Sequence, residues 1–171
     1  FQALYDSVNL YINFTTGDQN MVIKDSIIKE IDIASEDRVE VFLSSDITMK
    51  EYYCIEIDPV GRILDYKASF YRKFDDTWNL DGIQSTSKIS SEGYQVKLTI
   101  PLYFFREIGI NTDKDFYAGL FRADFEMSDS GLKEHWLSWI ELKNPEPDFH
   151  VPEALGIFRF SVEELGKDCL K

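Results

Sequence analysis

The sequence predicts an all-β fold, a jelly-roll-like antiparallel β-sandwich with one or two short helical turns. Three observations lead to this prediction. Apolar and polar residues alternate with period two in several segments, helical periodicity is nearly absent, and aromatic residues make up 15% of the 171 residues. Aromatic rings fill the space between packed sheets, so their large share suits a sandwich. We expect a single domain over residues 1–171, because this length supports one core and no repeat or linker interrupts it.

Alternation defines the expected strands in chain order. The clearest ones, each with an apolar and a polar face, are expected over 10–15, 39–44, 53–58, 64–70 and 94–100. Further strands are expected over 83–90, 116–125, 136–142 and 156–160. A turn over residues 58–61 joins two of the clearest strands, because Pro59 has a fixed φ and Gly61 tolerates a positive one. A second turn is expected over 90–93.

Helical turns are expected at two places. Pro101 suits the first position of a short helix that stops at Gly109. Ser161, with Glu164 three residues later, suits the cap of another turn. The chain starts at Phe1 without an initiator Met, so we expect that its N-terminal portion is processed or lies outside this sequence.

The charge of the chain excludes some classes of partner. A net charge of −13 would be repelled by nucleic-acid backbones and by anionic membrane surfaces. The balance fits a neutral ligand, a cationic ligand or a divalent metal. No apolar run is long enough to cross a bilayer, and no signal peptide is visible. Cys54 and Cys169 are expected to be free thiols, which leaves the redox compartment open.

Catalytic signatures are weak. A glycosidase needs two carboxylates at a set separation, and 31 acidic residues nominate no particular pair. Neither of the two histidines has a nucleophile or a metal-ligand spacing around it, and no glycine-rich phosphate loop is present. We therefore expect no catalytic activity, with a glycosidase as an outside alternative.

Four stretches, in this order, carry a family resemblance. They are Glu36–Leu43 with its Asp-Arg-Val-Glu sequence, Tyr53–Gly61 with its Asp-Pro-Val-Gly turn, Gly93–Pro101, and a discontinuous set made of 120–122, 138–139 and 149–156. Over most of residues 5–160 the chain resembles the family 9 carbohydrate-binding modules. The resemblance implies a non-catalytic jelly-roll domain that binds an oligo- or polysaccharide, often beside a fused glycoside hydrolase that degrades polysaccharides. It also implies a secreted, periplasmic or cell-surface location and a possible structural calcium ion.

The chain departs from the family pattern at the sugar clamp. Sugar-binding members hold a terminal sugar between two tryptophans, but no aromatic residue stands at 33–36 and Phe149 takes the second position. Cys54 is nearest to the place of an expected arginine. These departures leave open a degenerate sandwich that acts as a packing or protein-interaction domain.

Phe149 and His150 are the first candidate site residues, because Pro147 and Pro152 stiffen the loop around them. The ring gives a stacking face and the imidazole can donate and accept hydrogen bonds. Alternatively, Phe149 plugs the sandwich and His150 caps a carbonyl. Trp78 lies in a polar, turn-forming segment, so it is expected either on the same rim as Phe149, completing a one-sided clamp, or as a plug over the sandwich end.

Trp136 and Arg122 complete the candidate sugar-binding set. Trp136 and Trp139 are three residues apart, which places them on opposite faces of a strand. We expect Trp139 to be the more buried ring and Trp136 to face outward or lie under a loop. Arg122 suits either sugar hydroxyls or an ion pair with a carboxylate. The segment 124–131 is expected as an acidic loop that either holds Ca²⁺ or is simply solvated, so the metal remains unknown.

Overall fold

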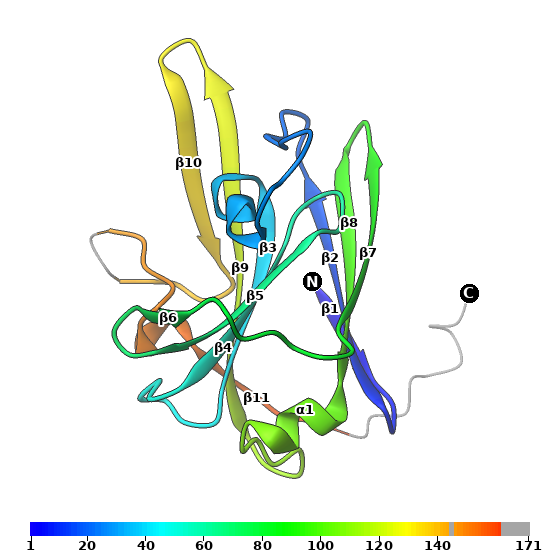
Figure 1. Cartoon of the computed structure of the whole chain (residues 1–171), viewed down its shortest axis with the longest axis vertical. Coiled ribbons are helices and arrows are strands. Elements are labelled where there is room, and N and C mark those ends of the chain that lie inside the picture. Colours follow the sequence, from blue (N-terminus) through cyan, green and yellow to red (C-terminus); the bar gives the residue numbers. More distant parts are fainter. Residues whose placement is uncertain (144–145, 162–171) are drawn as a thin grey trace.

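The computed structural model describes residues 1–143 and 146–161, and it consists of two antiparallel sheets (Figure 1). The smaller sheet has four strands, in the order β1 (Gln2–Tyr5), β2 (Asn9–Gly17), β8 (Gly93–Pro101) and β7 (Gln84–Ser90). The larger sheet has the order β10 (Gly131–Ser138), β9 (Phe116–Ser128), β3 (Arg38–Ser44), β4 (Tyr52–Ile57), β5 (Ile63–Ser69) and β6 (Lys73–Asp75). A short strand, β11 (Gly156–Phe158), also pairs with β9. The predicted all-β sandwich is confirmed.

Helices are few and short. The helix α1 (Leu102–Glu107) follows Pro101 as predicted, and two 3₁₀ turns, η1 (Glu30–Ser35) and η2 (Pro152–Ala154), were not expected. The turn predicted over 161–166 and the thiol predicted at Cys169 fall largely or wholly outside the described residues. Cys54 is a free, buried thiol, as expected.

The hairpin of β9 and β10 corrects two predictions. The segment 124–131 is not an acidic loop, because residues up to Ser128 belong to β9 and the chain turns back at Gly131, whose φ is 110°. The strand expected over 136–142 begins earlier and ends at Ser138. The hairpin projects beyond the body of the sandwich (Figure 1), and β10 is exposed along nearly its whole length. Alternation of buried and exposed residues therefore gives no signal there.

Two apolar clusters lie on opposite faces of the larger sheet. The cluster between the sheets contains residues such as Val41, Ile55 and Leu98. The second cluster lies on the outer face and contains Phe42, Cys54 and Tyr66. Strands β3 and β4 are consequently buried on both faces. The outer face is covered by η1 and by the chain after β10, and the candidate site lies beneath this cover.

Candidate functional site

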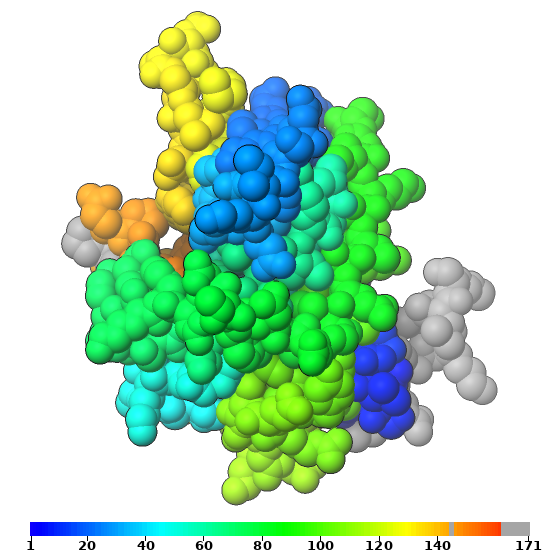
Figure 2. Space-filling model, viewed as in Figure 1, coloured from blue at the N-terminus to red at the C-terminus, as the bar shows by residue number. Residues whose placement is uncertain are grey.

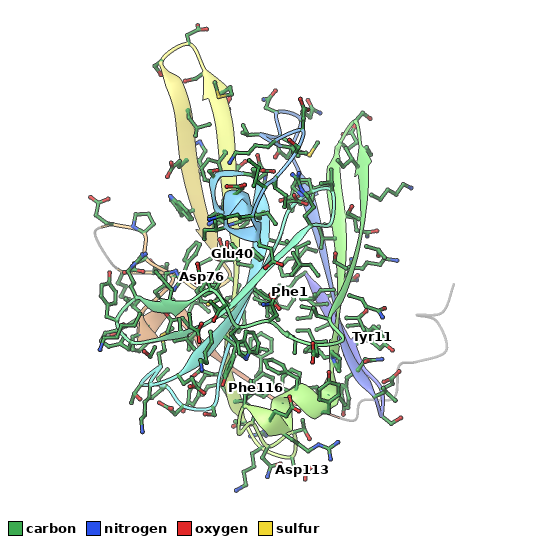
Figure 3. The ribbon with its side chains drawn as sticks, in the orientation of Figure 1. Phe1, Tyr11, Glu40, Asp76, Asp113 and Phe116 are labelled. Carbon is green, nitrogen blue, oxygen red and sulfur yellow. The ribbon has the colours of Figure 1, made fainter. Side chains whose placement is uncertain are left out.

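A cavity of about 470 Å³ opens on the outer face of the larger sheet. Its walls come from η1, β6, β10 and the loop after residue 146, which stands out in orange at the edge of Figure 2. Figure 3 labels two residues of the cavity, Glu40 and Asp76, on this side of the sheet. The lining consists of Ile31, Ala34, Arg38, Glu40, Glu56, Leu64, Tyr66, Arg72, Phe74, Asp76, Trp136, Pro147, Phe149 and His150.

Strand register explains why these side chains meet. Adjacent residues across a sheet point to the same face. One row across the outer face is Trp136, Ala123 and Arg38. The next row is Phe121, Glu40, Glu56 and Leu64. The cavity floor is therefore built from paired positions on neighbouring strands.

Aromatic rings form one wall of the cavity. Phe149 stacks on Phe121, with ring centroids 4.1 Å apart and planes 10° apart, and Trp136 meets Phe149 edge-on at 5.6 Å. A Cβ atom at Gly119 would lie 2.2 Å from the Phe121 ring, so glycine makes room for this stack. Phe149 is buried, whereas Trp136 keeps 37% of its surface exposed and can present a ring to a ligand.

The floor of the cavity holds one guanidinium between two carboxylates. Arg38 Nε donates a hydrogen bond to Glu56 Oε2, and Arg38 Nη2 lies 3.0 Å from Glu40 Oε1. Arg38 Nη1 donates to the carbonyl oxygen of Ala34 at 2.9 Å, and Tyr66 donates its hydroxyl to Glu56 Oε1 at 2.7 Å. All of these polar groups except the Ala34 carbonyl belong to buried residues. Glu56 therefore has a partner for each oxygen.

Glu40 is less well satisfied. Its carboxyl group is 2% exposed, and Oε1 receives no properly aligned hydrogen bond from any described residue, although Arg38 is near. Burial, together with the charge of Glu56, raises the pKa of Glu40 to about 8, against the opposing effect of Arg38. A buried carboxyl group with so few partners is costly, so a ligand donor that reaches the Glu40 carboxyl group from the cavity would be favourable.

His150 adds a second polar group to the lining. Its Nδ1 lies 3.0 Å from the Tyr52 hydroxyl, and its ring lies 5.0 Å from the Phe42 ring. Burial lowers the pKa of His150 to about 4, so the imidazole is neutral. The hydroxyl can donate to Nδ1 or accept from Nδ1–H, according to the imidazole tautomer. The expectation that His150 caps a carbonyl is wrong, because this contact is with Tyr52.

The loop that carries Phe149 and His150 is anchored by Asp148. This carboxylate accepts hydrogen bonds from the Tyr71 hydroxyl at 2.6 Å, from Arg72 Nη2 at 2.8 Å and from the His150 amide at 2.9 Å. These bonds, with Pro147, hold the loop without strand pairing. The ring wall is thus ordered before any ligand arrives, which lowers the entropy cost of binding.

Comparison with known proteins identifies the fold family. The profile of the family described as "Carbohydrate family 9 binding domain-like" matches residues 1–161. The chain belongs to this family. It is a family of non-catalytic carbohydrate-binding modules, so the predicted family and the predicted lack of catalysis are both supported. No curated protein matches the chain.

Two solved structures share the fold of this family 9 domain. A family 9 carbohydrate binding module from Caldicellulosiruptor kristjanssonii in complex with glucose is 15% identical, with a TM-score of 0.54, and the match covers 95% of this chain and 77% of that one. A module from the same organism in complex with cellotriose is 13% identical, with a TM-score of 0.56, and the match covers 96% and 76%. None of the helices among the described residues is long and apolar enough to cross a membrane.

Trp78 does not join the cavity of the family 9 domain. Its ring lies 5.0 Å from the Tyr53 ring and 5.7 Å from the Phe104 ring, in contact with the cluster between the sheets. Consecutive residues of β4 point to opposite faces, so Tyr52 meets His150 outside while Tyr53 meets Trp78 inside. The prediction of a shared rim for Trp78 and Phe149 is therefore wrong.

Trp139 also departs from expectation. It is 37% exposed, the same fraction as Trp136, and it packs against Phe1 at 6.1 Å and Phe158 at 4.9 Å. The argument from strand spacing fails because β10 ends at Ser138. Trp136, by contrast, faces the cavity beside Phe149, in agreement with the outward orientation expected for it.

Arg122 lies on the inner face, away from the cavity. Its Nη2 is 2.8 Å from Asp18 Oδ2, 2.9 Å from Asp124 Oδ1 and 3.6 Å from Asp37 Oδ1, and its guanidinium lies over the Tyr94 ring of the other sheet. The ion-pair alternative for Arg122 is the one that the structure contains.

The same three carboxylates are the described group that best resembles a metal site. Calcium takes six to eight oxygen ligands, and here three carboxylates already share a guanidinium. Asp37 also accepts hydrogen bonds from the backbone amides of Val22 at 2.7 Å and Phe125 at 3.3 Å. This cluster fits an internal cation, Arg122, and does not fit a calcium ion.

Sequence reasoning found part of the cavity and missed its floor. Trp136, Phe149 and His150 were expected and are brought together, whereas Arg38, Glu40 and Glu56 were not singled out. A signal was present, since Arg38 and Glu40 stand two positions apart on one largely apolar strand and Glu56 is the one charged residue of the next. Charges on a buried strand face require partners, and this pattern marks a site.

Proposed function

We propose that the outer-face cavity binds one sugar unit of an oligo- or polysaccharide and performs no chemistry on it. Sugar rings combine apolar faces with many hydroxyl donors, and the cavity offers an aromatic wall beside buried polar groups. The single observation that carries the proposal is the buried Glu40 carboxyl group, which lines the cavity beside that wall and whose one charged contact among the described residues is Arg38. A sugar hydroxyl would supply a further hydrogen bond to this group, and the neutral imidazole of His150 would hydrogen-bond a neighbouring hydroxyl.

The arrangement of the acids argues against hydrolysis. A glycosidase needs two carboxylates free to act on the scissile bond. Here Glu40 and Glu56 are paired side by side on neighbouring strands, and both Glu56 oxygens are occupied by Arg38 and Tyr66. These contacts favour recognition over catalysis and agree with the family assignment.

The two partly exposed tryptophans allow a matched test. Trp136 lines the cavity and Trp139 does not, yet both rings are 37% exposed. Calorimetric titration with glucose and cellotriose, the sugars bound by the related modules, should give binding to the wild type. Trp136→Ala should weaken it at least tenfold, about 1.4 kcal/mol. Trp139→Ala should bind like the wild type. Equal loss in both variants, or no binding to any glycan in a wider panel, would contradict the proposal.

We also infer that the domain works outside the cytoplasm beside a glycoside hydrolase that degrades polysaccharides. The support is the family assignment alone. The gene that encodes the chain tests this inference, because it should contain an export signal and a hydrolase domain in one reading frame or in a neighbouring one. A cytoplasmic product without a hydrolase nearby would contradict it.

A further inference from the structure

We propose that the cavity prefers a protonated amino sugar to the neutral sugar of the same shape. This inference rests on the proposed function, because it concerns the ligand of the same cavity. It follows from the charges and the unmet hydrogen-bonding capacity of the described residues that line it.

The charged residues of the cavity leave an excess of negative charge. On the floor, Arg38 is the one cation between Glu40 and Glu56, and it contacts both. The second cation, Arg72, is already paired with Asp148 at 2.8 Å. Asp76 adds a further carboxylate at the exposed rim. Since a buried carboxylate is stable only when its charge is compensated, Glu40 must either keep its proton or receive a second cation.

The hydrogen-bond geometry points to the same place. Glu40 is 2% exposed, lines the cavity and has an oxygen without an aligned donor among the described residues. An ammonium group carries three donors and a positive charge, so it would meet both needs of this carboxylate at once. A hydroxyl group would meet only the first. Burial raises the pKa of Glu40 to about 8, so without a ligand the group keeps its proton at neutral pH, and a bound ammonium group would take the place of that proton.

The walls suit the rest of such a ligand. Trp136 and Phe149 give an apolar face to the sugar ring. The chain as a whole has a net charge of −13, so its field attracts cationic ligands. Charge and shape therefore favour the same class of ligand.

Calorimetric titration of the wild type with glucosamine, glucose and N-acetylglucosamine tests the inference, at a pH at which the amine is protonated. Glucosamine should bind at least tenfold more tightly than glucose. N-acetylglucosamine, whose nitrogen is uncharged, should show no such gain. The preference should fall as salt is added, because ionic strength screens charge attraction.

Variants locate the effect. Glu40→Gln should remove the preference, so that this variant binds glucosamine no more tightly than it binds glucose. Asp76→Asn, at the exposed rim, should reduce the preference and serves if the floor variant fails to fold. Asp113→Asn removes one negative charge from an exposed site outside the cavity and should leave the preference intact.

The outcomes separate this inference from the proposed function. If glucose binds and glucosamine binds equally or more weakly, the charge inference is overturned and the sugar site stands. If Asp113→Asn lowers the preference as much as the cavity variants do, the preference comes from net charge and the inference is again overturned. If no sugar binds to the folded wild type, both proposals fall.

Discussion

Replacement of Glu40 by glutamine should stabilise the protein at alkaline pH and leave its stability nearly unchanged at acidic pH. Burial, with the charge of Glu56, raises the pKa of Glu40 from 4.5 to about 8. The folded protein therefore holds this proton more tightly than the unfolded chain does. The free energy of unfolding is greatest below the unfolded pKa and falls as pH rises from 4.5 through about 8. Glutamine cannot ionise, so Glu40→Gln avoids this loss.

The magnitude follows from the width of that window. Each pKa unit corresponds to about 1.4 kcal/mol, so the gap from 4.5 to about 8 sets an upper limit of about 5 kcal/mol. We expect about half of this to be observed, because Arg38 can move to follow the ionised carboxylate. The assay is urea unfolding of wild type and Glu40→Gln at about pH 4 and about pH 9, on either side of the window.

A control fixes the interpretation. Glu134 lies on the exposed strand β10, so Glu134→Gln removes the same charge without altering a buried group. Its stability should follow that of the wild type at both pH values. If Glu40→Gln and wild type differ by the same amount at both, Glu40 keeps its ordinary pKa and the account of an uncompensated carboxylate is wrong.

Four further predictions concern other groups. Burial lowers the pKa of His150 to about 4, so the wild type should lose up to about 3 kcal/mol of stability as pH falls from 6.5 to about 4. His150→Gln should not show this loss, and a pH series of urea unfolding in which it is as acid-sensitive as the wild type would contradict the prediction. Trp78→Ala should lower the free energy of unfolding by about 2–3 kcal/mol and leave glucose binding intact, because the ring packs between the sheets. If the folded variant loses glucose binding in calorimetry, Trp78 belongs to the binding site and this prediction is wrong. Arg122→Gln should cost about 3–5 kcal/mol, because three carboxylates would lose their shared cation. Millimolar calcium should not raise the melting temperature of the wild type, and a rise reversed by chelator would show that the cluster takes a metal ion.

The fold was largely predictable because its central strands alternate clearly. Strand β8, for example, alternates from Tyr94 to Ile100, and Pro101 fixes the start of α1. The hairpin of β9 and β10 was misjudged because β10 is exposed along both faces and carries no periodic signal. There the strand is held by backbone pairing with β9, which the sequence does not display.

The site was only partly predictable, because strand register and sheet faces decide it. Phe149 and His150 were visible through the prolines around them. Glu40 and Glu56 meet only because β3 and β4 pair at those positions, a long-range fact with no local signature. Trp78 looked equally suitable in its polar segment, but its neighbour Tyr53 points to the inner face.

The structure of the protein with cellotriose bound, determined by crystallography, tests the central claim most directly. The account predicts one terminal sugar ring in the outer-face cavity, against the face of Trp136, with a hydroxyl hydrogen-bonded to the Glu40 carboxyl group. Arg38 should remain between Glu40 and Glu56. A sugar bound elsewhere, for example beside Trp78 or on the exposed face of the smaller sheet, with the cavity holding only water, would contradict it.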